Sequence, residues 1–302
     1  MIFVIIERLY EAVETRGPVC VGLDPSPELI PQGLLRTAGS LAEAYLKFNR
    51  GIVDATLDVV ACYKVQIAHY EALGVEGLAC YRDTLRYIRD RGAIAIGDVK
   101  RGDIASTAAM YARAHFEGDF EADFLTLSPY LGFDSLEPFL PYLERGEKGL
   151  FVLIRTSNPS ASEFQDLSCF SHHRSPITHH EKSRHPLYLH VAEAVARWGE
   201  RFIGKCGYSA IGGVVGGTAG DALAQVRKSF PSLFLLVPGY GAQGASGRDV
   251  AVAFRDGNGA VVVAARSIIG AHRGKPDGDR RFPEYARAAA LAMREDIRRW
   301  IG

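Results

Sequence analysis

Three charged residues, Asp98, Lys100 and Asp103, lie within six residues of one another, directly after an apolar run at 93–96. The apolar run predicts a buried strand. Alternate residues of a strand point to the same side, so Asp98 and Lys100 are expected to share one face. Charged groups in a confined site must pair with each other or with a ligand. Such clusters are typical of sites that hold protons at unusual pKa values.

A second amine, Lys64, lies in another apolar segment, Cys62–Gln66, where it needs a partner. Together with Asp98, Lys100 and Asp103 it would form a network of alternating charges. Alternation keeps each group ionised and fixed in position, which suits a site that must stabilise charge developing on a substrate. The alternative interpretation is a structural ion-pair network at a strand end.

A glycine-rich segment at 238–244 follows one apolar run, and Arg266 follows the next. Glycines allow the backbone to approach an anion closely, and arginine binds phosphate with a fork of donors. This pattern predicts that the substrate carries a phosphate. The alternative is that the glycines form tight turns and that Arg266 pairs with an acidic surface residue.

The elements that must position these residues alternate along the whole chain. Strand-like runs are expected at 19–23, 59–66, 93–98, 124–128, 150–156, 210–215, 233–237 and 260–265. Helical patterns occur at 41–57, 77–91, 104–116, 136–144, 187–202, 221–230, 245–255 and 283–300. Eight such units in 302 residues predict an α/β protein with a single (β/α)₈ (TIM) barrel domain over residues 1–302. A doubly wound open sheet is the alternative, but no glycine-rich phosphate turn follows the first strand.

If the fold is a barrel, its site lies at the carboxyl ends of the strands. Polar or glycine-rich residues follow all eight predicted strands, including Asp24 after the first, Ser157-Asn158 after the fifth and Pro238 after the seventh. The expected site therefore collects residues that are far apart in the sequence.

Residues 160–185 interrupt the pattern with a polar stretch, and six of the nine histidines lie between His172 and His190. We interpret this stretch as an insertion that forms a loop or lid. A metal site is the alternative, but the irregular histidine spacing does not place ligands on one helix face. No metal is expected.

The composition excludes several classes of protein. The formal net charge is zero, with 35 basic and 35 acidic residues, which gives no support for nucleic-acid binding. The apolar runs are too short to span a membrane. Residues 1–6 lack the basic start of a signal peptide and instead begin an amphipathic helix. The five cysteines are an odd number without metal-ligand spacing, as expected of reduced thiols in a cytoplasmic protein.

The motifs resemble those of orotidine 5′-phosphate decarboxylase. Residues 98–103 match its Asp-x-Lys-x-x-Asp motif, and residues 100–108 resemble the longer bacterial (type 2) subfamily. Supporting matches occur in the same order at 21–25, 63–64, 156–159, 237–244 and 265–269. One departure is Ser160, where the family usually has glycine; a positive φ there would strain the serine.

The resemblance implies a cofactor-independent decarboxylase that makes UMP from orotidine 5′-monophosphate in pyrimidine biosynthesis, as a homodimer with shared sites. Lys100 would protonate the pyrimidine C6, Asp98 would face the substrate carboxylate, and Lys64 would link the charged network to the ribose. The resemblance implies that Asp24 contacts the ribose and that Ser157, with its neighbour Asn158, contacts the pyrimidine. Gln243 and Arg266 would contact the phosphate and form its closing loop, with Pro238 beside them. Asp103 and Thr107 would reach the neighbouring subunit's site.

Two alternatives remain. A sugar-phosphate decarboxylase or aldolase of the same superfamily would share the motif but use Mg²⁺. A non-catalytic nucleotide-binding barrel would bind the same ligand without turning it over, although an intact Lys100 argues against this.

Overall fold

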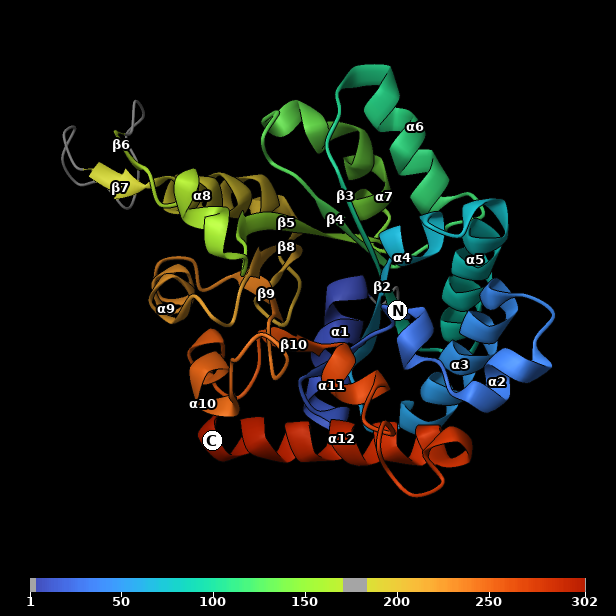
Figure 1. The fold of residues 1–302 in the computed structure, drawn as a ribbon. Coiled ribbons are helices and arrows are strands. Elements are labelled where there is room, and N and C mark those ends of the chain that lie inside the picture. Colours follow the sequence, from blue (N-terminus) through green and yellow to red (C-terminus); the bar gives the residue numbers. More distant parts are fainter. Residues whose placement is uncertain (1–3, 171–183, 302) are drawn as a thin grey trace.

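The protein is a closed barrel of eight parallel strands surrounded by helices (Figure 1). The computed structural model describes residues 4–170 and 184–301. Neighbouring strands follow the order β1-β10-β9-β8-β5-β4-β3-β2, and β1 pairs with β2 to close the ring. The predicted (β/α)₈ barrel is confirmed, and the doubly wound sheet is excluded.

All eight predicted strands are present, with ends shifted by up to three residues. They are β1 (Val19–Gly22), β2 (Cys62–Gln66), β3 (Ile94–Arg101), β4 (Phe124–Leu127), β5 (Gly149–Arg155), β8 (Ser209–Val215), β9 (Leu233–Pro238) and β10 (Ala260–Ala264). The register places Gln66 of β2 beside Asp98 of β3. The side chains at the ends of these adjacent strands therefore lie at the same height along the barrel axis.

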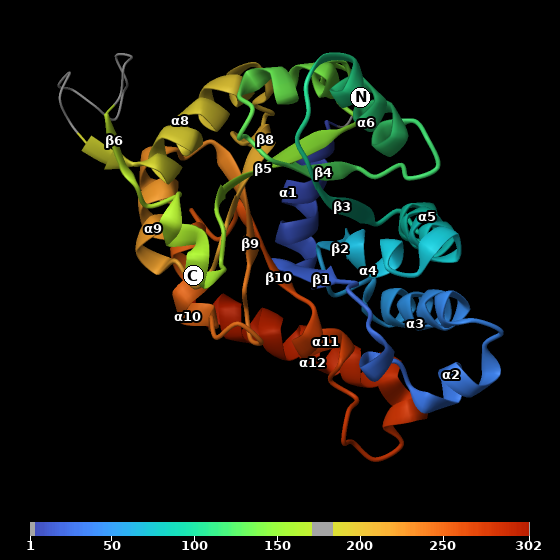
Figure 2. The same cartoon turned by 45° about the horizontal axis from the view of Figure 1, so that its top comes forward.

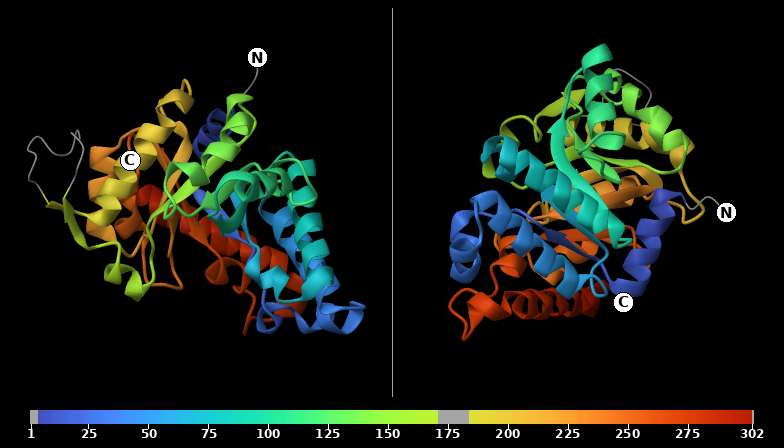
Figure 3. Two further views of the ribbon diagram at one scale, coloured as in Figure 1. Left: turned by 90° about the horizontal axis from the view of Figure 1, so that it is seen from above. Right: turned by 90° about the vertical axis from the view of Figure 1, so that its right-hand side faces the viewer.

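The helices pack outside the ring, except α1. They are α1 (Ile5–Arg16), α2 (Gln32–Thr37), α3 (Leu41–Thr56), α4 (Ala68–Glu71), α5 (Gly74–Asp90), α6 (Ala105–Phe116), α7 (Leu140–Glu144), α8 (Leu187–Gly199), α9 (Gly220–Ser229), α10 (Gly247–Val250), α11 (Arg266–Ile269) and α12 (Gly278–Ile301). The long α12 packs beside α3 and is drawn in red in both views of Figure 3. The helix expected at 245–255 is instead α10 followed by a 3₁₀ turn, Ala251–Ala253.

Strand alternation divides the core into two layers. On β2, Cys62 belongs to the layer inside the barrel, whereas Tyr63 and Val65 pack outward against the helices. Ile5, Ile6 and other apolar residues of α1 join the inner layer. In Figure 2, α1 (dark blue) accordingly lies among the strands and does not belong to the outer ring of helices. The predicted amphipathic helix is present from Ile5 onward, and its apolar face closes the amino-terminal end of the barrel.

The polar stretch at 160–185 contains more regular structure than the sequence indicates. Its two ends form an antiparallel pair, β6 (Ser168–Phe170) with β7 (Arg184–Pro186), which projects at the left of Figure 1. The Arg184 guanidinium lies 4.5 Å from the Phe170 ring centroid. The cross-strand pairs of β6 with β7 join residues 14 to 18 positions apart, so the sequence has no local periodicity that would reveal them. Four of the six histidines of the tract lie at 171–183, outside the described residues.

No helix formed by residues 4–170 and 184–301 combines the length and the apolarity that crossing a bilayer requires.

Candidate active site

A cavity of about 690 Å³ opens at the carboxyl ends of the barrel strands. Its floor is apolar and includes Val214 and Leu236, which belong to the inner core layer, and Leu153, which packs against that layer. The cavity brings together nine of the eleven residues predicted for the site: Asp24, Lys64, Asp98, Lys100, Ser157, Asn158, Pro238, Gln243 and Arg266.

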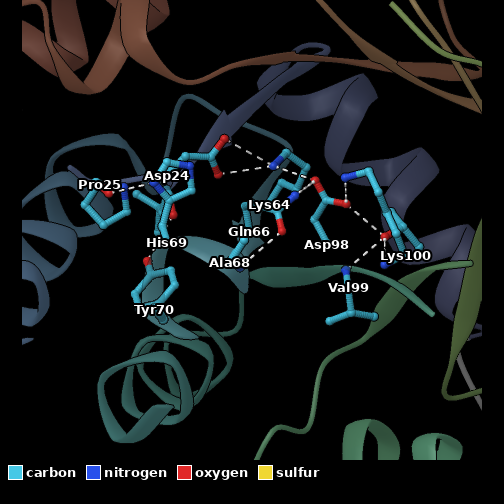
Figure 4. Close-up of polar contacts among 12 residues, drawn as sticks. Asp24, Pro25, Lys64, Gln66, Ala68, His69, Tyr70, Asp98, Val99 and Lys100 are labelled. Carbon is cyan, nitrogen blue, oxygen red and sulfur yellow. Dashed lines mark hydrogen bonds and ion pairs between the residues drawn. The ribbon is translucent and has the colours of Figure 1, made fainter. Parts of the chain in front are cut away.

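The Asp98 carboxylate accepts three hydrogen bonds and forms an ion pair with Lys64, so that both of its oxygens have two donor groups beside them (Figure 4). Oδ1 accepts from Lys100 Nζ at 2.6 Å and from Thr126 Oγ1 at 2.9 Å. Oδ2 accepts from Gln66 Nε2 at 2.9 Å and forms an ion pair with Lys64 Nζ, also at 2.9 Å. A carboxylate has about four acceptor positions, so Asp98 is fully occupied by donors.

Lys64 connects two carboxylates. Its Nζ lies 3.2 Å from Asp24 Oδ1 in addition to its contact with Asp98 (Figure 4). Burial disfavours the ammonium, but Asp24 and Asp98 outweigh burial and raise the pKa of Lys64 above its ordinary value. Burial likewise disfavours the Asp98 carboxylate, yet Lys64 and Lys100 hold the pKa of Asp98 below its ordinary value. The network therefore stays charged, as the alternating pattern predicts.

Lys100 is the exposed member of the network. Its side chain is 46% exposed, compared with 7% for Lys64 and 8% for Asp98, so its ammonium can meet a ligand in the cavity. Its backbone has φ +45°, a left-handed conformation that is rare outside glycine, at an irregularity in the β3–β4 pairing. An ammonium fixed beside a carboxylate can stabilise negative charge on a ligand and can deliver a proton to it.

The glycine-rich loop after β9 adopts the conformation for which glycine is needed. Gly239 has φ +113° and Gly241 has φ +69°. The Gln243 side chain lies over Gly239, and Ser267, next to Arg266, lies over Gly241. The loop and the start of α11 therefore meet at the cavity rim, where backbone and guanidinium can converge on an anion.

The loop after β5 is held by residues at the base of the insertion. Thr156 N donates to Gln165 Oε1 at 2.8 Å, and Thr156 Oγ1 contacts Asn158 Oδ1 at 2.7 Å. Arg155 forms a two-pronged ion pair with Asp166. Ser160 lies in a 3₁₀ turn, Pro159–Glu163, and does not have a positive φ, so the strain considered for this departure does not arise.

Asp103 and Thr107 do not line the cavity of their own chain. Asp103 Oδ1 accepts a hydrogen bond from Ile104 N at 2.8 Å, and Thr107 is exposed on α6. Within one chain, the network of described residues therefore runs from Asp24 through Lys64 and Asp98 to Lys100, and the expected link to Asp103 is absent. Asp103 lies beyond the strand, where the left-handed turn at Lys100 redirects the chain.

Sequence reasoning missed Thr126 and Gln66, which hold Asp98, and His69, which lines the cavity and contacts Pro25 O. Gln66 lies two residues after Lys64, and the same-face rule of strands could have identified it. Thr126 lies in an apolar strand in which a β-branched residue is ordinary, so its type carried no signal.

The closed parallel barrel, with its charged cavity at the carboxyl ends of the strands, places the protein among the (β/α)₈-barrel enzymes. Residues 17–278 match the model of the orotidine 5′-phosphate decarboxylase / HUMPS family. The chain belongs to this family.

Curated relatives and solved structures agree with this assignment. The chain is 50% identical to orotidine 5′-phosphate decarboxylase of Petrotoga mobilis, covering 97% of this chain and 98% of the relative. It is 48% identical to that of Clostridium novyi, covering 98% and 99%. A solved structure of a putative orotidine-monophosphate-decarboxylase from Toxoplasma gondii has a TM-score of 0.81 at 31% identity, and the match covers 99% of this chain and 96% of that one.

Proposed function

We propose that this chain is a carboxy-lyase that converts orotidine 5′-monophosphate to UMP and carbon dioxide in pyrimidine biosynthesis. Membership of the family and near-full-length relatives of that name support this activity. The observation that carries it is the donor-saturated Asp98 carboxylate between Lys64 and the exposed Lys100 ammonium. The rival sugar-phosphate reaction has no such support among the curated relatives reported above.

Lys100 is the proton donor in this proposal. The bond between C6 and the carboxylate breaks, and its electron pair stays on C6 while carbon dioxide leaves. The carbanion has no remote electron sink, so nearby charge must stabilise it. The Lys100 ammonium supplies that charge, transfers a proton to C6 and later regains one from solvent. No cofactor takes part in these steps.

The substrate can lie across the cavity with its phosphate at the rim. Gln243 and Arg266 would hold the phosphate, and Asp24 with Lys64 would hold the ribose. The pyrimidine would then lie near Ser157 and Asn158, with C6 facing Lys100. Binding energy from the distant phosphate can in this way contribute to the decarboxylation step.

The active assembly is proposed to be a cytoplasmic homodimer of single-domain subunits. Asp103 and Thr107 lie in a region with exposed apolar side chains, including Ile104 (49% exposed), Met110 (58%) and Tyr130 (90%). A second copy of the chain that covers this region would bury the apolar side chains and bring Asp103 toward the neighbouring site. The dimer thus accounts for two predicted site residues that do not reach their own cavity.

The test is the fall in ultraviolet absorbance of orotidine 5′-monophosphate with purified protein, with and without EDTA. Equal turnover in both is expected. Activity that disappears with EDTA and returns with Mg²⁺ would favour the metal-dependent rival. Binding of UMP without any turnover would instead favour the non-catalytic barrel.

A further inference from the structure

The buried hydroxyl of Thr126, on β4, lies behind the reactive lysine. Thr126 is 1% exposed, and its Oγ1 accepts hydrogen bonds from Val99 N and Lys100 N, each at 3.0 Å. The same oxygen lies 2.9 Å from Asp98 Oδ1. One hydroxyl group therefore contacts both the backbone of Lys100 and the carboxylate that pairs with the Lys100 side chain.

The direction of the hydroxyl proton follows from its partners. A hydroxyl has one proton to donate and two lone pairs. Backbone N–H groups can only donate, so Val99 and Lys100 occupy the lone pairs. The proton must then point to Asp98, which adds a donor to this carboxylate. All three hydrogen-bonding positions of the Thr126 hydroxyl are used. Any other rotation of the hydroxyl would lose at least one of these hydrogen bonds.

These contacts hold Lys100 in a strained backbone conformation. A left-handed φ in a residue other than glycine is unfavourable unless the surroundings hold it. At Lys100, the regular pairing of β3 with β4 is interrupted, and Gly97↔Leu125 is followed by Arg101↔Leu127. Thr126 lies between these two β4 partners and accepts the two N–H groups that the interruption frees from the ladder. The hydroxyl thus replaces the missing strand contact.

We propose that Thr126 is a positioning residue for decarboxylation, whose hydroxyl fixes the Lys100 backbone and the Asp98 carboxylate in one geometry. The proposal rests on the function proposed above, in which Lys100 must meet C6 of the substrate. Without the hydroxyl, the Lys100 backbone is free to relax away from its left-handed conformation. The ammonium would then lose its alignment, while the phosphate and ribose contacts stay intact.

The test compares Thr126→Val, which keeps the branched shape without the hydroxyl, with Thr126→Ser, which keeps the hydroxyl. Misalignment of a reacting group lowers rates by roughly 10- to 100-fold, so Thr126→Val should lose about that much in kcat. Its KM and its affinity for UMP should stay near wild type, because the groups proposed to bind the nucleotide are unchanged. Thr126→Ser should recover most of the kcat.

Thr84→Val is a matched control, because Thr84 is also 1% exposed and its Oγ1 accepts from Asn49, away from the cavity. It should lower the melting temperature without lowering kcat. If Thr126→Val does not fold, Thr126→Ala is judged by the same criteria, and failure of both to fold would overturn the positioning role in favour of a structural one.

Three further results would overturn the proposal. They are an unchanged kcat in Thr126→Val, equal losses of kcat in the Val and Ser variants, and a loss confined to KM. Wild-type turnover is measured in the same assay, so an inactive wild type would contradict the proposed function rather than the role of Thr126.

Discussion

Lys100 combines an unfavourable backbone with a favourable side-chain environment. Its φ of +45° is strained, whereas its ammonium lies 2.6 Å from Asp98 Oδ1. Strain of this kind is maintained where the surrounding structure determines the conformation, and it concentrates at functional sites. At Lys100, the irregular pairing of β3 with β4 holds the backbone in this conformation.

Lys100→Ala should abolish nearly all turnover in a folded protein. Alanine keeps the same Cβ at the same φ, so the backbone strain does not change and the ammonium alone is lost. Loss of a proton donor lowers rates by about 10²–10⁴-fold, and the loss of its charge adds to this. The measurement is kcat from the absorbance assay, with UMP affinity as the test of folding. Lys47→Ala, which removes an exposed amine of α3, should have no effect. Activity of Lys100→Ala within tenfold of wild type would contradict the mechanism.

His115 should make the protein less stable in mild acid. Burial and the charge of Arg101 lower the pKa of His115 to about 4, from an ordinary value near 6.5. Between these two pKa values, His115 binds a proton in the unfolded chain but not in the folded chain. The free energy of unfolding therefore falls as the pH decreases from 6.5 toward 4. At pH 5 the loss from this group is about 2 kcal/mol.

The measurement is urea unfolding at pH 7 and pH 5 for the wild type and for His115→Gln. The variant cannot titrate in this range, so its stability should change less between the two pH values. An identical pH dependence in both proteins would show that His115 is not responsible.

The sequence predicts the charged residues of the site well and their supports poorly. Asp98, Lys100 and Lys64 are identifiable because charge in an apolar strand requires a reason. Nothing in the sequence distinguishes Thr126, because its role depends on the irregular pairing of β3 with β4. That irregularity is a contact between two strands and not a local pattern. The place of Asp103 depends on a turn of the backbone that spacing does not specify.

At the scale of elements, the strands were predictable because each is a short apolar run ending in polar or glycine residues. Helix ends were less predictable. Short helices such as α2 and α4 have too few turns to show a period, and β6 with β7 is defined by pairing across residues that have no local pattern.

The meeting of the β9 loop with α11 predicts a substrate-dependent effect of Arg266→Ala. Loss of a charge-assisted contact should lower kcat/KM for orotidine 5′-monophosphate by about 10- to 100-fold. Reaction of orotidine, which lacks the phosphate, should hardly change. Arg273→Ala, which removes a neighbouring guanidinium outside the cavity, is the control. Equal losses with both substrates would show that Arg266 is not a phosphate ligand.

The insertion should be dispensable for the reaction if its base is kept. Leu187 N already donates to Leu167 O at 2.8 Å, so a short turn can replace residues 168–184. This deletion keeps Gln165 and Asp166, which hold the loop after β5. Turnover and metal content, measured by elemental analysis, should match wild type. Stoichiometric zinc that disappears with the deletion would show that the tract is a metal site.

At the scale of the whole molecule, a dimer with shared sites predicts complementation between two inactive variants. In a mixed dimer of Lys100→Ala and Asp103→Ala, one site would contain both changes and the other would contain neither. With random exchange about half of the dimers are mixed, so roughly a quarter of wild-type activity should return, as two-fold symmetry requires.

Exchange is first demonstrated with differently tagged chains. Lys100→Ala mixed with Lys64→Ala is the control, because both residues lie in the cavity of their own chain and every site would keep one change. Activity that stays at the single-variant level after confirmed exchange would show that Asp103 acts within its own chain.

The packing of α1 beneath the barrel has a consequence for the gaseous product. Ile5, Ile6 and the inner core layer close the amino-terminal end, so nucleotide and carbon dioxide exchange through the opening at the carboxyl ends of the strands. A nucleotide that occupies this opening also delays the escape of carbon dioxide, which can then recombine with the carbanion. In the proposed mechanism, commitment to product therefore depends on how fast Lys100 protonates C6 relative to that return.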